Sequence, residues 1–461
     1  MSAAQDIDVG ALIESQPRGW FAASIVFWSC ALMFIEGYDM QVAAYAAPAI
    51  IKEWQIDRAA LGPVFGAGLF GYMLGATCLS DLADRFGRKR VILAGMWLFG
   101  LFTLAASFAS SLDVLLVLRF VAGIGLGGSI PTAIALNAEY APANRRATRI
   151  ALMFVGYTIG AAGGGLLVAQ LMPVFGWKVT FVIGGLAPLA LSLILLRTLP
   201  ESARFLALRP RPTSGQAARL AAILARLRPD LAIPPDARFV LREVRQPGLP
   251  VRQLFRDGRA LTTALLWIAF VTSFVGHHFL TSWLPTVLVS DGIPLGHAVI
   301  AAALFQAGGT IGSLVVGRLI DLRGIAALAV TFAVGAPLVA LIGAPGLGEA
   351  ALMGVVFVSG IFVLGGQVGL NALAGTFYPT FIRSTGAGWA FGVGRVGSIL
   401  GPVLGGILIG LGLPTWLLLI CAAVPLLCCA GAAGWLRAAA EPSADPPADG
   451  FPAPGSRPAG A

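Results

Sequence analysis

Twelve long apolar runs, separated by short polar breaks, constrain the fold of this chain more than any other feature. A helix rises about 1.5 Å per residue, so about 20 apolar residues cross the roughly 30 Å hydrocarbon core of a bilayer. Because every backbone polar group must be satisfied within lipid, the runs predict an all-α polytopic membrane protein. They cover residues 20–46, 60–80, 90–110, 114–138, 149–171, 178–196, 261–288, 297–320, 325–344, 350–376, 385–410 and 413–436.

The composition agrees with a membrane location. Of the 461 residues, 57% are hydrophobic and only 11% are charged, and the 59 glycines suit close helix packing in lipid. The net charge of +9 does not indicate a nucleic-acid partner, because the basic residues follow the loops on one side of the expected membrane. The five cysteines lie in apolar runs without metal-ligand or disulfide spacing, so we expect no metal and no cofactor.

The distribution of Lys and Arg predicts the topology. Basic residues concentrate in alternate loops, which places both termini in the cytoplasm by the positive-inside rule. The first apolar run is too long for a cleavable signal peptide and should remain as the first span. We expect two six-helix halves, with these boundaries: a cytoplasmic N-terminus at 1–19, the first half at 20–196, a cytoplasmic linker at 197–260, the second half at 261–437, and a disordered cytoplasmic tail at 438–461.

Two acids interrupt the first apolar run. Glu36 and Asp39 are three residues apart in F-I-E-G-Y-D-M, so on a helix they share one face. An acid within a bilayer normally faces the interior of a helix bundle or a water-filled cavity. Their sequence context predicts an ion or proton site, and the alternative is a structural acid paired with an Arg elsewhere in the bundle.

An internal repeat relates the two halves. The segment E-Y-A-P-A-N-R-R-A-T (139–148) and the segment F-Y-P-T-F-I-R-S-T (377–385) each follow a Gly-rich span and run into a Gly-studded helix. The same offset pairs Tyr157 with Arg395. Duplicated halves are typical of transporters, whose substrate site lies between the halves near the bilayer midplane.

The loop after the second run carries a charged motif. The sequence S-D-L-A-D-R-F-G-R-K-R (80–90) places a carboxylate beside cations at a helix end, a pairing that can hold one conformation and release in another. It resembles the signature loop of the major facilitator superfamily, and G-R-L-I-D-L-R-G (317–324) is a degenerate second copy. The expected gating residues are Asp84, Arg85, Gly87, Arg88, Lys89, Asp321 and Arg383.

Three further stretches resemble the aromatic acid:proton symporters within that superfamily. Glu36–Asp39 resembles their D-G-x-D motif with Glu in place of the first Asp, residues 119–128 resemble their fourth helix, and residues 378–406 resemble their eleventh. The resemblance implies a bacterial inner-membrane protein that imports an aromatic carboxylic acid, such as a hydroxybenzoate, protocatechuate or benzoate, together with protons by alternating access. It also implies that Asp39 is the coupling acid and that Glu36 assists it.

A carboxylate substrate needs a positive counter-charge, and Arg matches both carboxylate oxygens. Arg395 and Arg119 are the Arg candidates within the spans, although either can instead pair with an acid, for instance Arg119 with Asp113 or Glu139. Since His277 and His278 are adjacent, we expect only one of them to face the cavity. The full set of expected substrate-binding residues is Arg395, Arg119, His277, His278, Asn371 and Gln367.

Other functions stay open at this point. A membrane-embedded enzyme is an alternative class, but the chain has no Ser/His/Asp order, no metal-ligand spacing and no phosphate loop. A transporter-like sensor would be expected to have lost the acids or gained a signalling domain. Within transporters, the alternatives are a proton-coupled carrier of another organic acid or metabolite, or an exporter. We expect a monomer whose partners are the acid, protons and the lipid bilayer, with no nucleic acid.

Overall fold

The fold is a bundle of long helices in a computed structural model that describes residues 6–17, 19–208, 214–230, 238–240, 251–256, 258–378 and 383–440. Within these residues, twelve helices are long and apolar enough to cross a membrane. This confirms the expected twelve-helix architecture. The helices are α2 (Trp20–Trp54), α3 (Gly62–Phe86), α4 (Arg88–Ala106), α5 (Leu112–Glu139), α6 (Ala143–Phe175), α7 (Lys178–Thr198), α10 (Ala260–Ser290), α11 (Leu295–Arg323), α12 (Ile325–Ile342), α13 (Glu349–Phe377), α14 (Arg383–Gly410) and α15 (Thr415–Ala440).

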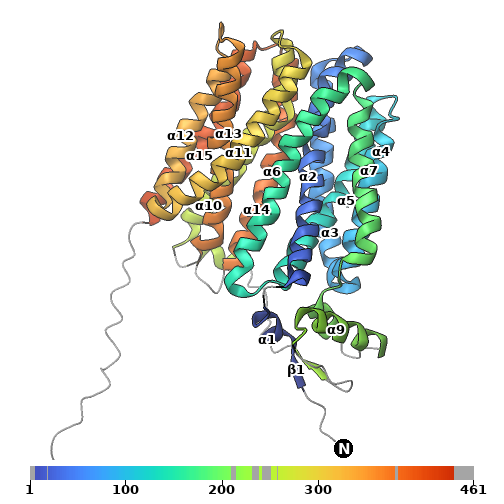
Figure 1. The fold of residues 1–461 in the computed structure, drawn as a ribbon. Coiled ribbons are helices and arrows are strands. Elements are labelled where there is room, and N and C mark those ends of the chain that lie inside the picture. Colours follow the sequence, from blue (N-terminus) through green and yellow to red (C-terminus); the bar gives the residue numbers. More distant parts are fainter. Residues whose placement is uncertain are drawn as a thin grey trace, which may run out of the picture.

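The two groups of six helices repeat the same packing. In the first half α2 packs on α6, α3 on α5 and α4 on α7, and in the second half α10 packs on α14, α11 on α13 and α12 on α15. Figure 1 shows the two groups side by side, one coloured blue to green and the other yellow to red. Each half therefore reproduces the arrangement of the other, as the repeat in the sequence predicts.

Glycines let the paired helices touch backbone to backbone. A Cβ at Gly37 would lie 1.9 Å from the carbonyl oxygen of Tyr157, and one at Gly160 would lie 1.9 Å from that of Phe34. In lipid, where apolar surface gives no solvent-driven attraction, such close approach is a main source of helix association. These contacts fix the rotation of α2 against α6, and so the direction in which the acids on α2 point.

Short elements gather at one end of the bundle, which we call the linker end. They are β1 (Asp6–Asp8), α1 (Val9–Glu14), α8 (Ala203–Ala207), α9 (Ser214–Leu227), β2 (Arg238–Val240) and the 3₁₀ helix η2 (Val251–Phe255). Figure 1 shows α1, α9 and β1 together below the first half. β1 pairs in parallel with β2, and Ile13 of α1 and Leu224 of α9 are fully buried.

This packing was not anticipated for the N-terminal segment. Residues 1–19 are expected only as a cytoplasmic N-terminus before the first span, whereas Val9 and Ile13 belong to the hydrophobic core of the first half. A run of only six helical residues carries too short a pattern to reveal this packing. The expected disordered tail lies outside the described residues beyond position 440.

At the opposite end of the bundle the two halves press together. The 3₁₀ helix η1 (Arg58–Leu61) lies against α14, where a Cβ at Gly62 would lie 3.3 Å from the Cα of Gly406. Nearby, the rings of Phe65 and Trp283 meet edge to face with centroids 5.0 Å apart. The halves are thus closed against each other on the side away from the linker.

Candidate functional site

The acid Asp39 forms a buried ion pair with Arg119 of α5. Both guanidinium ends donate, from Nη1 to Oδ1 and from Nη2 to Oδ2, each over 2.9 Å. The Asp39 side chain is 1% exposed, and the Thr103 hydroxyl donates to the same carboxylate over 3.4 Å. Arg119 is therefore paired with an acid, as the alternative reading allowed, but the acid is Asp39 rather than Asp113 or Glu139.

The second acid, Glu36, reaches across to the other half. Its carboxylate lies close enough to the Arg395 guanidinium of α14 and to the Tyr72 hydroxyl of α3 to interact electrostatically with both. The Arg395 guanidinium lies 4.5 Å from the centroid of the Tyr72 ring, a cation–π contact that also joins the halves. The Oε2 atom of Glu36 is buried and has no hydrogen-bond partner. Glu36 is therefore less fully satisfied than Asp39.

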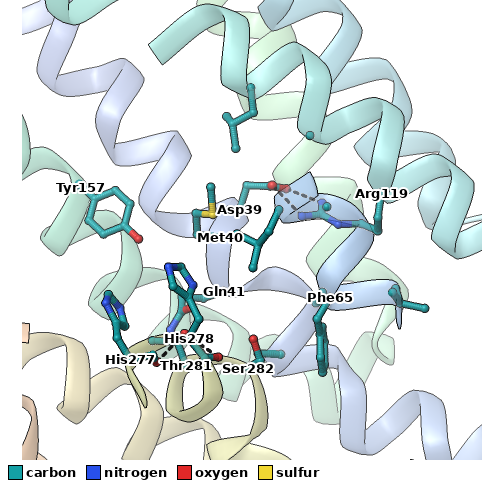
Figure 2. Close-up of a pocket in the computed structure, with 17 residues that line it drawn as sticks. Asp39, Met40, Gln41, Phe65, Arg119, Tyr157, His277, His278, Thr281 and Ser282 are labelled. Atoms are coloured by element: carbon teal, nitrogen blue, oxygen red, sulfur yellow. Dashed lines mark hydrogen bonds and ion pairs between the residues drawn. The ribbon is translucent and has the colours of Figure 1, made fainter. Parts of the chain in front are cut away.

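A cavity lies between the halves beside these acids. It is lined by Asp39, Met40, Gln41, Ala43, Ala44, Val64, Phe65, Gly68, Leu69, Arg119, Gly123, Leu126, Tyr157, His277, His278, Thr281 and Ser282. Figure 2 shows the Tyr157 hydroxyl and both histidines directed into this space. Its volume is about 40 Å³, room for about three waters, since one water needs roughly 10–15 Å³. An aromatic ring would enter only after the halves shift.

Both histidines line the cavity, which corrects the expectation that one would pack away. Their rings stack with centroids 4.7 Å apart and planes 13° apart, and Phe274 extends the stack beyond His278. Residues next to each other on a helix point about 100° apart, but the rotamers turn the two rings parallel and to the same side. His277 also interacts electrostatically with Arg395, which connects the cavity to the second arginine.

The amide residues Gln367 and Asn371 of α13 do not line the cavity. The Ser273 hydroxyl donates to the Gln367 carbonyl over 2.5 Å, and Gln367 in turn donates to Asn371 over 3.3 Å. Ser273 and Gln367 are both buried. This network joins α10 to α13 within the second half, the ordinary role of polar residues between helices in lipid.

The charged motif forms a network at the linker end of the first half. Arg88 pairs with Asp84 over 2.7 Å and with Glu139 over 2.9 Å. The backbone N–H groups of Arg88 and Lys89 donate to the Glu201 carboxylate over 2.8 and 3.2 Å, which caps a helix that has no side-chain cap of its own. The motif thus joins three segments that are far apart in the sequence.

Two further contacts complete this network. The Tyr140 hydroxyl donates to the Glu201 carbonyl oxygen over 2.5 Å, and the Ser202 hydroxyl donates to the Glu139 carboxylate. Burial raises the pKa of the Tyr140 hydroxyl, and the negative charge of the nearby Glu201 raises it further, so the hydroxyl remains a neutral donor. Gly87 adopts φ +104°, a conformation that favours glycine, and a Cβ there would lie 2.3 Å from the Glu201 carboxylate.

Three expected gating residues, Arg85, Asp321 and Arg383, lie at or near the ends of helices. Arg85 is exposed at the end of α3. Asp321 falls near the end of α11 and Arg383 begins α14, but their side chains lie outside the part of the chain that the structure describes. Those two assignments stay predictions.

Sequence reasoning missed several residues that the fold brings to the site. Tyr72, Tyr157 and Gln41 surround the acids, and Glu201 caps α4. Gln41 carried a usable signal, because it is an amide side chain in the same apolar run as Glu36 and Asp39. Among the described residues, no group of three His, Cys, Asp or Glu side chains lies close enough to hold a metal ion.

Known proteins resemble this chain over most of its length. A family model described as Major Facilitator Superfamily matches residues 29–390. The 4-hydroxybenzoate transporter PcaK of Pseudomonas aeruginosa is 37% identical over 414 residues, covering 89% of this chain and 92% of that protein. A gallate transporter of Pseudomonas putida is 38% identical over 409 residues, covering 88% of this chain and 90% of that protein.

A solved structure is similar in fold. A bacterial homologue of the human lysosomal transporter Spinster, in an inward-facing and occupied conformation, superposes with a TM-score of 0.70. The alignment covers 92% of this chain and 98% of that one at 17% identity, so this similarity concerns the fold alone.

Proposed function

This chain belongs to the Major Facilitator Superfamily, and we propose that within this superfamily it imports an aromatic carboxylic acid together with protons. It is a multi-pass transporter of the bacterial inner membrane and not an enzyme. Relatives named for 4-hydroxybenzoate and gallate support an aromatic acid as the substrate. The stacked histidines and the apolar wall of the cavity suit an aromatic ring.

The charge balance between two acids and two arginines is the observation that carries the proposal. Asp39 neutralises Arg119, and Glu36 faces Arg395. A substrate carboxylate that binds Arg395 would leave the site with one excess negative charge. A proton on Glu36 restores neutrality and releases Arg395 for the substrate, so one proton would accompany each anion at this step.

Glu36 is the better candidate for the proton, which reverses the ranking from sequence. Both oxygens of Asp39 accept from Arg119, whereas Oε2 of Glu36 has no partner in the structure. The charged form of a buried carboxylate is stabilised most where both of its oxygens accept hydrogen bonds, as in Asp39, and less where one oxygen accepts none, as in Glu36. We therefore assign proton exchange to Glu36 and a supporting electrostatic role to Asp39.

The expected topology and the closed end of the bundle support alternating access. With both termini cytoplasmic, the linker end faces the cytoplasm, and the contact of Gly62 with Gly406 closes the outward side. Import then requires this contact to open while the linker end closes, as expected for rocking of two halves around a central site.

Uptake of radiolabelled aromatic acids tests the proposal. Cells that express the chain should accumulate 4-hydroxybenzoate, protocatechuate or benzoate in a saturable manner, and a protonophore should abolish accumulation. Protein level in the membrane is measured in parallel. Absence of accumulation at a normal protein level would leave another organic anion, or export, as the better function.

A further inference from the structure

Two buried polar atoms in the cavity have no hydrogen-bond partner. They are Nε2 of Gln41 on α2 and Nδ1 of His277 on α10. Gln41 is only 2% exposed, and both residues line the cavity. The Tyr45 hydroxyl lies near Gln41 and donates to the Ala161 carbonyl, but its contact with Gln41 Nε2 does not have the distance and angle of a hydrogen bond.

These two atoms come from opposite halves of the protein. Figure 2 shows Gln41 beside His277 and His278, with the Tyr157 hydroxyl on the far side of the same space. Buried polar groups are nearly always paired in folded proteins, and leaving them unpaired is costly. Two such groups facing one cavity need a partner inside it, which is water before substrate binds and a polar group of the substrate once a bound ring displaces that water.

The chemistry of the two groups defines that partner. An amide N–H donates, and a neutral imidazole nitrogen without hydrogen accepts. A phenolic hydroxyl satisfies both, since its oxygen accepts from Gln41 while its hydrogen is donated to His277. A ring bearing only a carboxylate would leave both atoms unpaired, because under the proposed function its carboxylate binds Arg395.

We propose that Gln41 and His277 bind a ring hydroxyl of the substrate, so that the transporter selects hydroxylated aromatic acids over benzoate. The inference rests on the proposed function, which supplies the aromatic acid. The hydroxyl must lie meta or para to the carboxylate, since an ortho hydroxyl bonds its own carboxylate and would stay at Arg395. A hydroxyl held this way also bridges α2 to α10 and thereby links the halves around the bound ring.

The test compares initial uptake rates of 4-hydroxybenzoate, 3-hydroxybenzoate, 2-hydroxybenzoate and benzoate in wild type and in Gln41→Leu and His277→Leu. Sites built to bind a hydroxyl reject analogues that lack it. We expect the wild-type ratio of kcat/KM for 4-hydroxybenzoate over benzoate to fall at least about tenfold in either variant. His277→Asn, which keeps a polar atom near the position of Nδ1, should recover part of the ratio.

Thr286→Val is the matched control. The Thr286 hydroxyl is also buried without a partner on α10, but it does not line the cavity, so its loss should leave the ratio unchanged. Equal ratios in wild type, Gln41→Leu and His277→Leu would overturn the inference alone. Failure of the wild type to accumulate any of the four acids would overturn the proposed function and the inference with it.

Discussion

Asp39 and Arg119 join α2 to α5 through two parallel hydrogen bonds of 2.9 Å each, in a part of the bundle where Asp39 is almost completely buried. Burial removes water from both charged groups, and the free-energy cost of this desolvation offsets much of the attraction between them. The pair therefore adds little net stability, but each charge needs the other to remain buried. Removing one partner leaves the other charged, buried and unpaired.

Asp39→Asn and Arg119→Gln should each lower the free energy of unfolding by about 3–5 kcal/mol, because each leaves a buried charge without its partner. Thermal unfolding in detergent measures the effect. The double variant should lose less than the sum of the two single losses. Additive losses would show that the two side chains do not form the pair described.

Glu36→Gln should uncouple transport from protons. The substituted amide mimics the protonated acid, so Arg395 remains available to the substrate at every pH. Wild-type affinity should fall as the pH rises, because deprotonated Glu36 then competes for Arg395, whereas the affinity of Glu36→Gln should stay constant. Binding to purified protein at several pH values checks this. An equal pH dependence in both proteins would contradict the assignment.

Uptake by Glu36→Gln adds an independent check. The variant should exchange labelled for unlabelled substrate across a vesicle membrane but should not accumulate it against a gradient, with or without a protonophore. Loss of exchange as well as accumulation would place Glu36 in substrate binding rather than in proton coupling.

Arg395→Gln should raise the KM for an aromatic acid at least about tenfold, because the substrate carboxylate loses its counter-charge. Arg395→Lys keeps the charge but loses the fork and the planar contact with Tyr72, so we expect an intermediate KM. Initial rates at a series of substrate concentrations measure both. An unchanged KM in Arg395→Gln would show that the substrate carboxylate does not bind Arg395.

Gly37→Ala should destabilise the first half by about 1–3 kcal/mol or more, because a Cβ at this position collides with the Tyr157 carbonyl oxygen. Gly163→Ala on the partner helix α6 is the control, since no atom lies within 4 Å of a Cβ there. It should be neutral or stabilising through its better helix propensity. Similar unfolding temperatures for both variants would argue against the close approach of α2 and α6.

Glu201→Ala should lower the free energy of unfolding by about 1–2 kcal/mol, because the backbone N–H groups of Arg88 and Lys89 at the N-terminus of α4 lose their acceptor. Glu201→Gln keeps an acceptor oxygen and should lose less. Thermal unfolding again provides the measurement, and hydrogen exchange of the first turn of α4 localises the change. An equal loss of unfolding free energy in the two variants would show that Glu201 stabilises the protein through its negative charge rather than by accepting the hydrogen bonds of the cap.

Much of the architecture follows from local sequence properties. Runs of about 20 apolar residues predict spans because length and hydropathy decide whether a helix enters lipid. The repeat with its offset from Tyr157 to Arg395 predicts two equivalent halves, and the helix packing repeats in both. The acids were found in the same way, since a charge in a long apolar run is conspicuous without any knowledge of its neighbours.

The sequence alone determined that Glu36 and Asp39 share a helix face, but only the tertiary structure decided their partners. Arg119 lies 80 positions from Asp39, and Arg395 is in the other half of the chain. The periodicity of a helix orders side chains on that helix only. Which side chain meets which arginine depends on how each helix is rotated against its neighbours, and that rotation is set by close backbone contacts such as Gly37 on Tyr157.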